Sequence, residues 1–141
     1  MIDRLTPAER SAHMARIKRS DTRPELIVRK LLFRLGYRFR IQMRGVPGRP
    51  DVAFPRRRKA IYVHGCFWHA HENCSVSRVP KTRTAFWKAK FAANRERDRR
   101  LEASARQAGW SCLVVWECEL RDEVTLARLL TSHLGTPKAQ R

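Results

Sequence analysis

The chain has 141 residues, which suits one domain of ordinary size. It carries 31 lysines and arginines against 13 aspartates and glutamates, a formal charge of +18, and 43% of its residues are hydrophobic. This composition predicts a folded protein that binds a polyanion, and with so many hydrophobic residues the charge does not indicate a disordered chain. No apolar run reaches the length of a membrane span or of an export signal, so we expect a cytoplasmic protein with reduced cysteines.

The N-terminal third predicts two helices and one strand. Residues 6–9 (TPAE) have the form of a capping box and open a short polar helix that ends at about residue 18. A second box at 22–25 (TRPE) opens a core-facing helix that stops at Gly36. Residues 37–43 alternate apolar and polar side chains, as a half-exposed strand does.

The rest of the chain predicts a mixed α/β arrangement. Its expected elements are a short strand at 51–54, a central strand at 60–63, an irregular loop at 65–81, a long helix at 84–108, a buried strand at 110–116 and a last helix that begins near residue 122. This order favours a mixed sheet flanked by helices. We therefore expect an N-terminal arm at 1–20, a folded domain at 21–135 and a frayed tail at 136–141.

The irregular loop carries ligands for a soft metal ion. Three of its residues have metal-ligand spacing, namely Cys66, His71 and Cys74. Three cysteines with one histidine form a common zinc set, and such an ion would hold together a loop that has no hydrophobic core of its own. The alternative is a set of buried thiols that bind no metal.

Residue spacing alone does not identify the fourth metal ligand, and it does not show which histidine binds the metal. Cys112 lies within an apolar run and suits the core, whereas Cys118 follows the strand, where the chain can turn toward the loop. We therefore favour Cys118. His64 and His69 compete with His71, and spacing alone does not rank these three histidines.

Carboxylates are scarce in this chain, so their positions are informative. Asp51 follows a Gly-Arg-Pro turn at the start of a strand, where it could bind a hard divalent cation or serve as an ordinary turn residue. Asp98 lies on the apolar stripe of the long helix and needs a histidine, an arginine or a metal as its partner. A structural salt bridge is the alternative for Asp98. Glu25 has a local explanation as a capping-box residue.

Aromatic and arginine side chains suit contact with nucleic acid. Phe67 and Trp68 lie in the loop, and Trp87 begins the long helix. These rings either form a small core around the metal or insert between bases. The arginine runs at 56–58 and 95–100 suit contacts to phosphates.

Several of these motifs, taken in order, resemble the very-short-patch repair (Vsr) mismatch endonucleases. The motifs are 10–14 (RSxxM), 21–25 (DTxPE), 46–51 (VPGRPD), 64–71 (HGCFWHxH), 94–100 (NxxxDRR) and 116–118 (WEC). The similarity spans about residues 10 to 120, and HGCFWH beside PGRPD is highly specific.

The resemblance implies a restriction-endonuclease-like α/β fold with a zinc-stapled loop. It further implies a magnesium-dependent enzyme that nicks double-stranded DNA on the 5′ side of the thymine in T:G mismatches, which arise when 5-methylcytosine deaminates. The implied active-site residues are Asp51 and the backbone carbonyl of Val63 as magnesium ligands, His69 as general base or water-positioning group, and Glu25, His64 and Asp98.

The resemblance also assigns the metal ligands and the DNA contacts. The structural zinc ligands would be Cys66, His71, Cys74 and Cys118, the rings inserted at the mismatch Phe67, Trp68 and Trp87, and further DNA contacts Arg49, Arg95 and Arg99. Two departures from the best-known member stand out. Val63 replaces a threonine, so only a backbone ligand is available there, and the second zinc cysteine lies one residue further along.

These implications define the expected protein. It would be a monomeric, bacterial-type enzyme of the cytoplasm and nucleoid, with a DNA-contacting arm, no membrane association and mismatch-repair proteins as candidate partners. We expect Asp98 to accept the N–H of His69 and so to fix the tautomer of that ring. The alternative is a non-catalytic, zinc-stapled module that binds nucleic acid.

Overall fold

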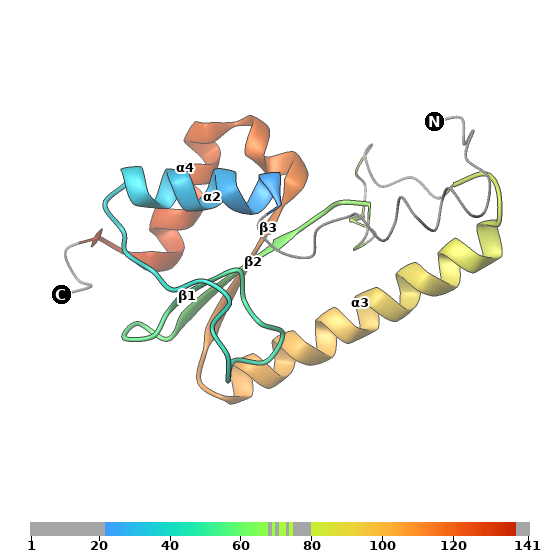
Figure 1. Cartoon of the computed structure of the whole chain (residues 1–141), viewed down its shortest axis with the longest axis horizontal. Coiled ribbons are helices and arrows are strands. Elements are labelled where there is room, and N and C mark those ends of the chain that lie inside the picture. The colour runs from blue at the N-terminus through green and yellow to red at the C-terminus, as the bar shows by residue number, and fades with distance from the viewer. Residues whose placement is uncertain (1–21, 68, 70, 73, 75–79, 138–141) are drawn as a thin grey trace.

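The computed structural model describes residues 22–67, 69, 71–72, 74 and 80–137 (Figure 1). Its elements are, in chain order, α2 (Arg23–Arg34), β1 (Val52–Phe54), β2 (Lys59–His64), α3 (Thr84–Gln107), β3 (Ser111–Trp116), the 3-10 helix η1 (Glu117–Arg121) and α4 (Glu123–Leu134). The arm predicted at 1–20, the side chain of Trp68 and most of the predicted tail lie outside the described residues.

The three strands form one mixed sheet in the order β1-β2-β3. β1 runs antiparallel to β2, with Val52 opposite Ile61, and β2 runs parallel to β3, with His64 opposite Trp116. A parallel pair needs a long crossover, which here includes α3. The mixed sheet and its helices confirm the predicted α/β class.

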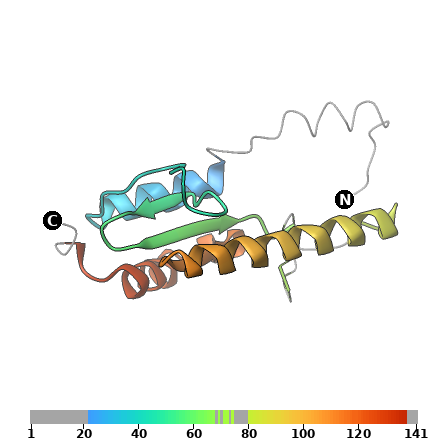
Figure 2. The same cartoon turned by 90° about the horizontal axis from the view of Figure 1, so that it is seen from below.

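Helices cover both faces of this sheet (Figures 1 and 2). Because side chains alternate along a strand, Ile61 and Val115 face the layer of α2 and α4, whereas Tyr62 and Val114 face α3. The N-terminal half of α3 continues beyond the sheet. No helix among the described residues combines the length and the apolar character that crossing a membrane requires.

Helix α2 forms where the sequence predicts it, but its first turn differs from the prediction. Thr22 is the N-cap, and Gly36 follows the helix with φ 98°, a conformation that suits glycine. The expected capping contact does not form, because the Thr22 hydroxyl donates to the Glu25 carboxylate at 3.2 Å instead of accepting from the backbone. Glu25 is therefore not explained by capping, and it is only 5% exposed.

The strand predicted at 37–43 is wrong. Within this segment only Arg40 pairs, in an isolated antiparallel bridge with Ala53. Gln42 has φ 50°, which interrupts any strand. Tyr37 is fully buried, and its hydroxyl donates to the carbonyl of Gly135 after α4. The alternation reflects a connecting segment that packs one side against the core.

Candidate active site and metal centre

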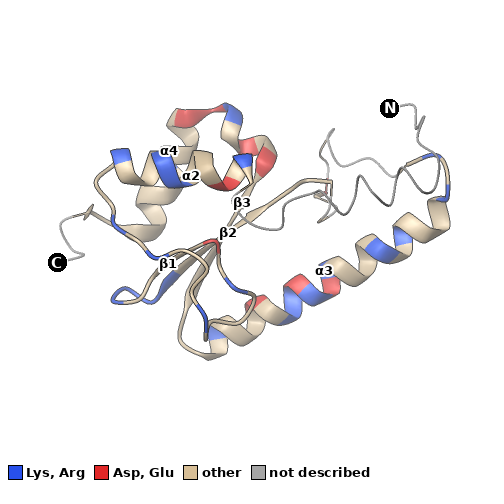
Figure 3. Cartoon of the chain, in the orientation of Figure 1, with Lys and Arg blue, Asp and Glu red and all other residues tan. Residues whose placement is uncertain are grey.

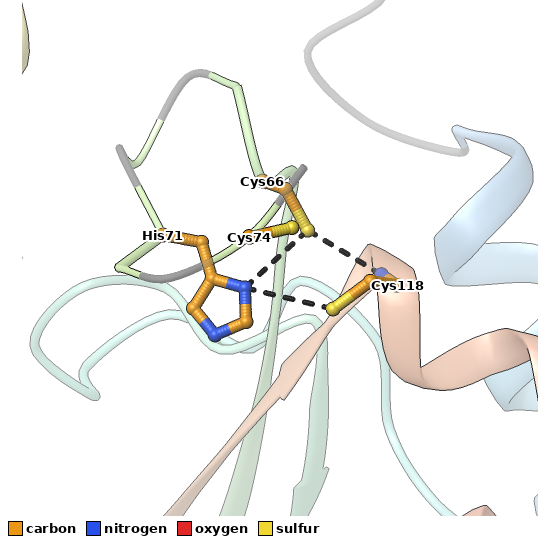
Figure 4. A group of neighbouring side chains, drawn as sticks. All are labelled: Cys66, His71, Cys74 and Cys118. Carbon is orange, nitrogen blue, oxygen red and sulfur yellow. Dashed lines mark hydrogen bonds between the residues drawn. The ribbon is translucent and has the colours of Figure 1, made fainter. Parts of the chain in front are cut away.

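One cluster combines three sulfur atoms and one imidazole nitrogen (Figure 4). Cys66, His71 and Cys74 come from the loop after β2, and Cys118 comes from η1 after β3. We call these four residues the Cys/His group. Their ligand atoms all lie within 4.8 Å of one another. Of the competing side chains, Cys112 packs against the core on the α3 face.

The distances in the Cys/His group fit a tetrahedral metal ion. His71 Nδ1 lies 3.6 Å from Cys66 Sγ and 3.5 Å from Cys118 Sγ. Bonds of about 2.3 Å to sulfur and about 2.0 Å to nitrogen, at tetrahedral angles, place the two ligand atoms about 3.5 Å apart. Four protein ligands complete a tetrahedron, so such an ion would have a structural role.

The environment of the thiols also favours a cation. Burial raises the pKa of Cys66 to about 12 and raises that of Cys118, so both thiols stay protonated at neutral pH unless a positive charge stabilises the thiolates. The backbone N–H of Cys118 donates to Cys66 Sγ at 3.4 Å. This donor is oriented toward the sulfur that would carry negative charge.

A second cluster contains two carboxylates, Asp51 and Glu25, which we call the carboxylate pair. Asp51 precedes β1, and its Oδ2 accepts the N–H of Val63 at 2.6 Å. Glu25 projects from α2 and is paired with Arg29 at 3.1 Å. Burial raises the pKa of Asp51 to about 7 despite the hydrogen bond from Val63, and the Glu25 carboxylate contributes in the same direction. A cation beside the pair would favour the ionised form of Asp51.

The backbone of β2 adds an oxygen atom to this edge. In an extended strand, the amide and the carbonyl of one residue face the same side, so the Val63 carbonyl points toward the side on which Asp51 lies. Carboxylate and carbonyl oxygens are ligands that hard divalent cations such as magnesium prefer. The Val63 side chain packs against the α2–α4 core and supplies no ligand.

A third cluster, the imidazole group, contains His64, His69 and Asp98. His69 Nδ1 lies 2.5 Å from Asp98 Oδ2, which confirms the predicted contact between these side chains. The rings of His64 and His69 stack with centroids 3.9 Å apart and an angle of 6° between their planes. His64 comes from the end of β2, His69 from the loop and Asp98 from α3.

The charges in the imidazole group favour proton transfer at His69. Burial opposes the ionisation of Asp98, but the hydrogen bond with His69 and nearby positive charge outweigh it and lower the Asp98 pKa. Burial, together with the neighbouring His69, lowers the pKa of His64 to about 4, so His64 is neutral at neutral pH. An ionised Asp98 holds the His69 proton at Nδ1 and leaves Nε2 able to accept another.

The imidazole group is arranged less well for binding a metal, although its three ligand atoms lie within 4.8 Å of one another. The lone pair of an imidazole nitrogen lies in the plane of the ring, so a metal ion must lie in that plane as well. The nearly parallel planes of His64 and His69 share no such position close to both rings. The geometry therefore favours acid–base chemistry.

The imidazole group opens into a cleft of about 380 Å³. Arg95 and Arg99 of α3 line it, and each pairs with an exposed carboxylate, Glu72 and Glu96 respectively. Lysine and arginine recur along α3 and on the turn between β1 and β2 (Figure 3). The predicted contact Arg49 lies exposed in the turn before β1. Phosphate groups could replace the exposed carboxylates.

The aromatic residues form a small cluster where α3 meets the loop. Phe67 packs against Trp87 at 5.6 Å and against Phe91 at 5.1 Å, measured between ring centroids. Phe91 is buried, whereas Phe67 and Trp87 are half-buried and Phe86 is 44% exposed. Phe67 and Trp87 therefore have a packing role, and their accessible edges leave contact with DNA open as a second one.

The sequence predicts no functional role for two residues of the site. Arg29 pairs with Glu25 one helical turn away, a spacing that could have indicated the ion pair. Trp116 lines the cleft and stacks on His71, although its position in a buried strand indicated only a core residue.

The sequence of this chain is similar to those of known proteins. A family model described as DNA mismatch endonuclease Vsr matches residues 2–75. Type II nicking enzyme V.XorIIP of Xanthomonas oryzae pv. oryzae is 48% identical over 122 residues, which cover 86% of this chain and 89% of that protein. DNA mismatch endonuclease Vsr of Escherichia coli is 45% identical over 135 residues, which cover 95% of this chain and 86% of that protein.

Type II nicking enzyme V.NmeAIP of Neisseria meningitidis is 38% identical over 123 residues, which cover 87% of each chain. The fold and these similarities define the protein as a DNA endonuclease, a hydrolase of restriction-endonuclease-like architecture. More particularly, the chain belongs to the Vsr family of DNA mismatch endonucleases, which acts in very short patch repair.

Proposed function

We propose that this protein nicks one strand of duplex DNA on the 5′ side of the thymine in a T:G mismatch, with magnesium at the carboxylate pair and zinc at the Cys/His group. One observation carries the catalytic part of the proposal. Val63, whose N–H binds Asp51, is followed directly in β2 by His64, which stacks on His69. Ligands for a hard cation and a proton acceptor therefore occupy the same end of β2.

The two metal assignments follow from the chemistry of the ligands. Sulfur and imidazole ligands suit zinc, whereas carboxylate and carbonyl oxygens suit magnesium. Asp51 and the Val63 carbonyl would hold magnesium, with Glu25 beside them. When bound, magnesium stabilises negative charge on the scissile phosphate and lowers the pKa of its bound water.

The residues of the imidazole group would move the proton. His69 accepts the proton of the attacking water at Nε2, because Asp98 holds the other proton at Nδ1. Asp98 then stabilises the imidazolium that forms. His64 stays neutral and supports the ring of His69 by stacking. Arg95 and Arg99 would bind phosphates along the wall of the cleft.

Recognition of the mismatch would depend on aromatic side chains. Phe67 and Trp87 lie at the end of α3 nearest the loop, and Trp68 follows Phe67 in sequence. We propose that these rings insert beside the mismatch, while the arm at 1–20 and Arg49 contact the duplex. We further propose a monomer that acts on the bacterial nucleoid in the cytoplasm, with mismatch-repair proteins as partners.

The decisive experiment compares a T:G duplex with its T:A counterpart, each labelled in turn on one strand. We expect one nick, in the strand that contains the mismatched thymine, and only when magnesium is present. His64→Gln keeps a neutral side chain at that position but removes the ring that stacks on His69. We therefore expect this variant to nick the T:G duplex more slowly than the wild type but still measurably. Binding of the T:G duplex without any nick would support the alternative, a non-catalytic nucleic-acid-binding module.

A further inference from the structure

The indole of Trp116 lies between the Cys/His group and the imidazole group. It stacks on His71, with centroids 4.0 Å apart and an angle of 7° between the planes. It also meets His64 at 5.2 Å and His69 at 6.4 Å, both nearly perpendicular. One side chain therefore contacts a ring of the proposed zinc site and both rings of the proposed proton-transfer site.

The main chain holds this indole in place from two sides. Trp116 is the last residue of β3, and it lies opposite His64 in the parallel pair. The backbone N–H of Trp116 donates to the side-chain oxygen Oε1 of Glu119 in η1 at 2.8 Å, and η1 also contains Cys118. A change in the Cys/His group therefore reaches Trp116 through the His71 ring and through η1.

The orientation of the His69 ring needs such support. The torsion that rotates an imidazole about its Cβ–Cγ bond has a broad energy minimum, so packing must define the ring angle. Asp98 fixes one edge of His69, and His64 covers one face. Trp116 contacts both histidines and restricts their joint tilt.

We propose that Trp116 is a positioning residue that couples the position of the His71 ring to the orientation of the His69 ring. The zinc at the Cys/His group would then do more than close the loop, because it would also align the group that accepts the proton. This inference rests on the proposed function, which assigns the zinc and the role of His69. A perturbed Cys/His group would slow nicking even in a protein that stays folded.

The test uses the full chain, loaded with zinc and labelled with ¹⁵N-histidine. The reporter is the proton on His69 Nδ1, whose 2.5 Å contact with Asp98 predicts a strongly downfield ¹H signal. Trp116→Leu should keep about one zinc per chain but lose or broaden this signal. Its single-turnover nicking of the T:G duplex should fall by about tenfold to a hundredfold, the scale expected for a misplaced catalytic group.

Two further variants sharpen the result. Trp116→Phe keeps a ring for His71 but reaches the other histidines less well, so we expect a shifted signal and a loss of about two- to fivefold. His71→Cys supplies a four-cysteine zinc set and removes the ring on which Trp116 stacks, and it should disturb the same signal. Trp110→Phe is the matched control, because Trp110 directly precedes β3 at its other end and is buried in the core cluster that contains Ala105 of α3.

The outcomes separate this inference from the proposed function. An unchanged His69 signal and an unchanged nicking rate in zinc-loaded Trp116→Leu would overturn the coupling while the endonuclease assignment stands. If Trp116→Leu does not fold, the same two results in Trp116→Phe would overturn it. A wild-type protein that does not nick the T:G duplex would refute the proposed function, and the His69 signal would still report on Trp116.

Discussion

The Cys/His group and the carboxylate pair lie at the same end of the parallel strands but differ in how they are enclosed. Cys118 follows β3, whereas Asp51 lies beside Val63 near the end of β2. The first group offers four possible protein ligands for one ion, while the second offers oxygen atoms at an edge of the sheet. A closed site suits a structural ion and an incomplete one leaves positions for water and substrate. We therefore expect substitutions in the carboxylate pair to lower mainly the nicking rate, and substitutions in the Cys/His group to lower mainly the stability of the protein.

The largest effect on catalysis should come from Asp51→Asn. Loss of the proposed magnesium ligand would remove several kcal/mol of transition-state stabilisation, so the single-turnover nicking rate should fall by about a thousandfold or more. Binding of the T:G duplex should remain close to that of the wild type.

The same variant should be more stable than the wild type when magnesium is absent. Burial raises the pKa of Asp51 to about 7, so ionisation of this residue costs stability as the pH rises through that value. Asparagine carries no charge and keeps an oxygen for the Val63 N–H. The melting temperature at pH 8 in EDTA should therefore rise. A lower melting temperature together with lost DNA binding would identify Asp51 as a structural turn residue.

The second largest effect should come from the contact between Asp98 and His69. Asp98→Asn removes the charge that orients and supports the imidazole, and we expect a loss of about a hundredfold in single-turnover nicking. His69→Ala should lose as much or more. The double variant should cost little beyond the worse single change, because the two residues act as one unit. Multiplicative losses would show that Asp98 acts separately, as a structural ion-pair partner.

Cys74→Ser should affect stability more than chemistry. Removing one ligand weakens zinc binding, so we expect a lower metal content and a free energy of unfolding reduced by about 2 kcal/mol or more. The fraction that stays folded and metal-loaded should nick within about tenfold of the wild-type rate. Cys112→Ser is the matched control, because Cys112 packs outside the Cys/His group. Equal zinc loss from both variants would contradict the assigned ligand set.

The sequence predicted the elements whose signals are local. The long amphipathic helix, the last strand and the glycine after α2 all lie where periodicity and end signals place them. The predicted burial of that strand is wrong, because β3 is an edge strand of the sheet and only Val115 in it is buried. The strand prediction at 37–43 fails because alternation records which side of the chain is buried, whether or not a neighbouring strand is present. Tyr37 alternates with exposed arginines only because its ring packs toward the carbonyl end of α4.

The candidate site was predictable to the extent that its residues belong to specific motifs. The contact between Asp98 and His69 could be inferred because a carboxylate on an apolar stripe requires a partner. Glu25 was harder, because a capping box explains the same residue locally, and only the tertiary structure shows that it lies beside Asp51. The role of Trp116 depends on three histidine rings, one from the end of β2 and two from the loop, and no spacing in the sequence encodes their angles.

The smallest effect should come from the arginines, and it extends the comparison to the two ends of the sheet. Arg99 lines the cleft beside the imidazole group, whereas Arg56 is exposed on the turn between β1 and β2, at the opposite end. Each phosphate contact releases about one counterion. Arg99→Ala should therefore make the negative slope of log affinity against log salt concentration shallower by about 1.

This loss should be a few-fold in affinity and equal for T:G and T:A duplexes, because a phosphate contact carries no base information. Arg56→Ala removes the same charge from the far end and should change neither slope nor affinity. Fluorescence anisotropy titrations across a range of salt concentrations measure both quantities. If the two variants weaken binding equally, the duplex is attracted by the charge of the whole molecule. The cleft then contributes no more to DNA affinity than the rest of the surface. A loss confined to Arg99→Ala would instead place the DNA backbone along α3, over the residues that are proposed to cut it.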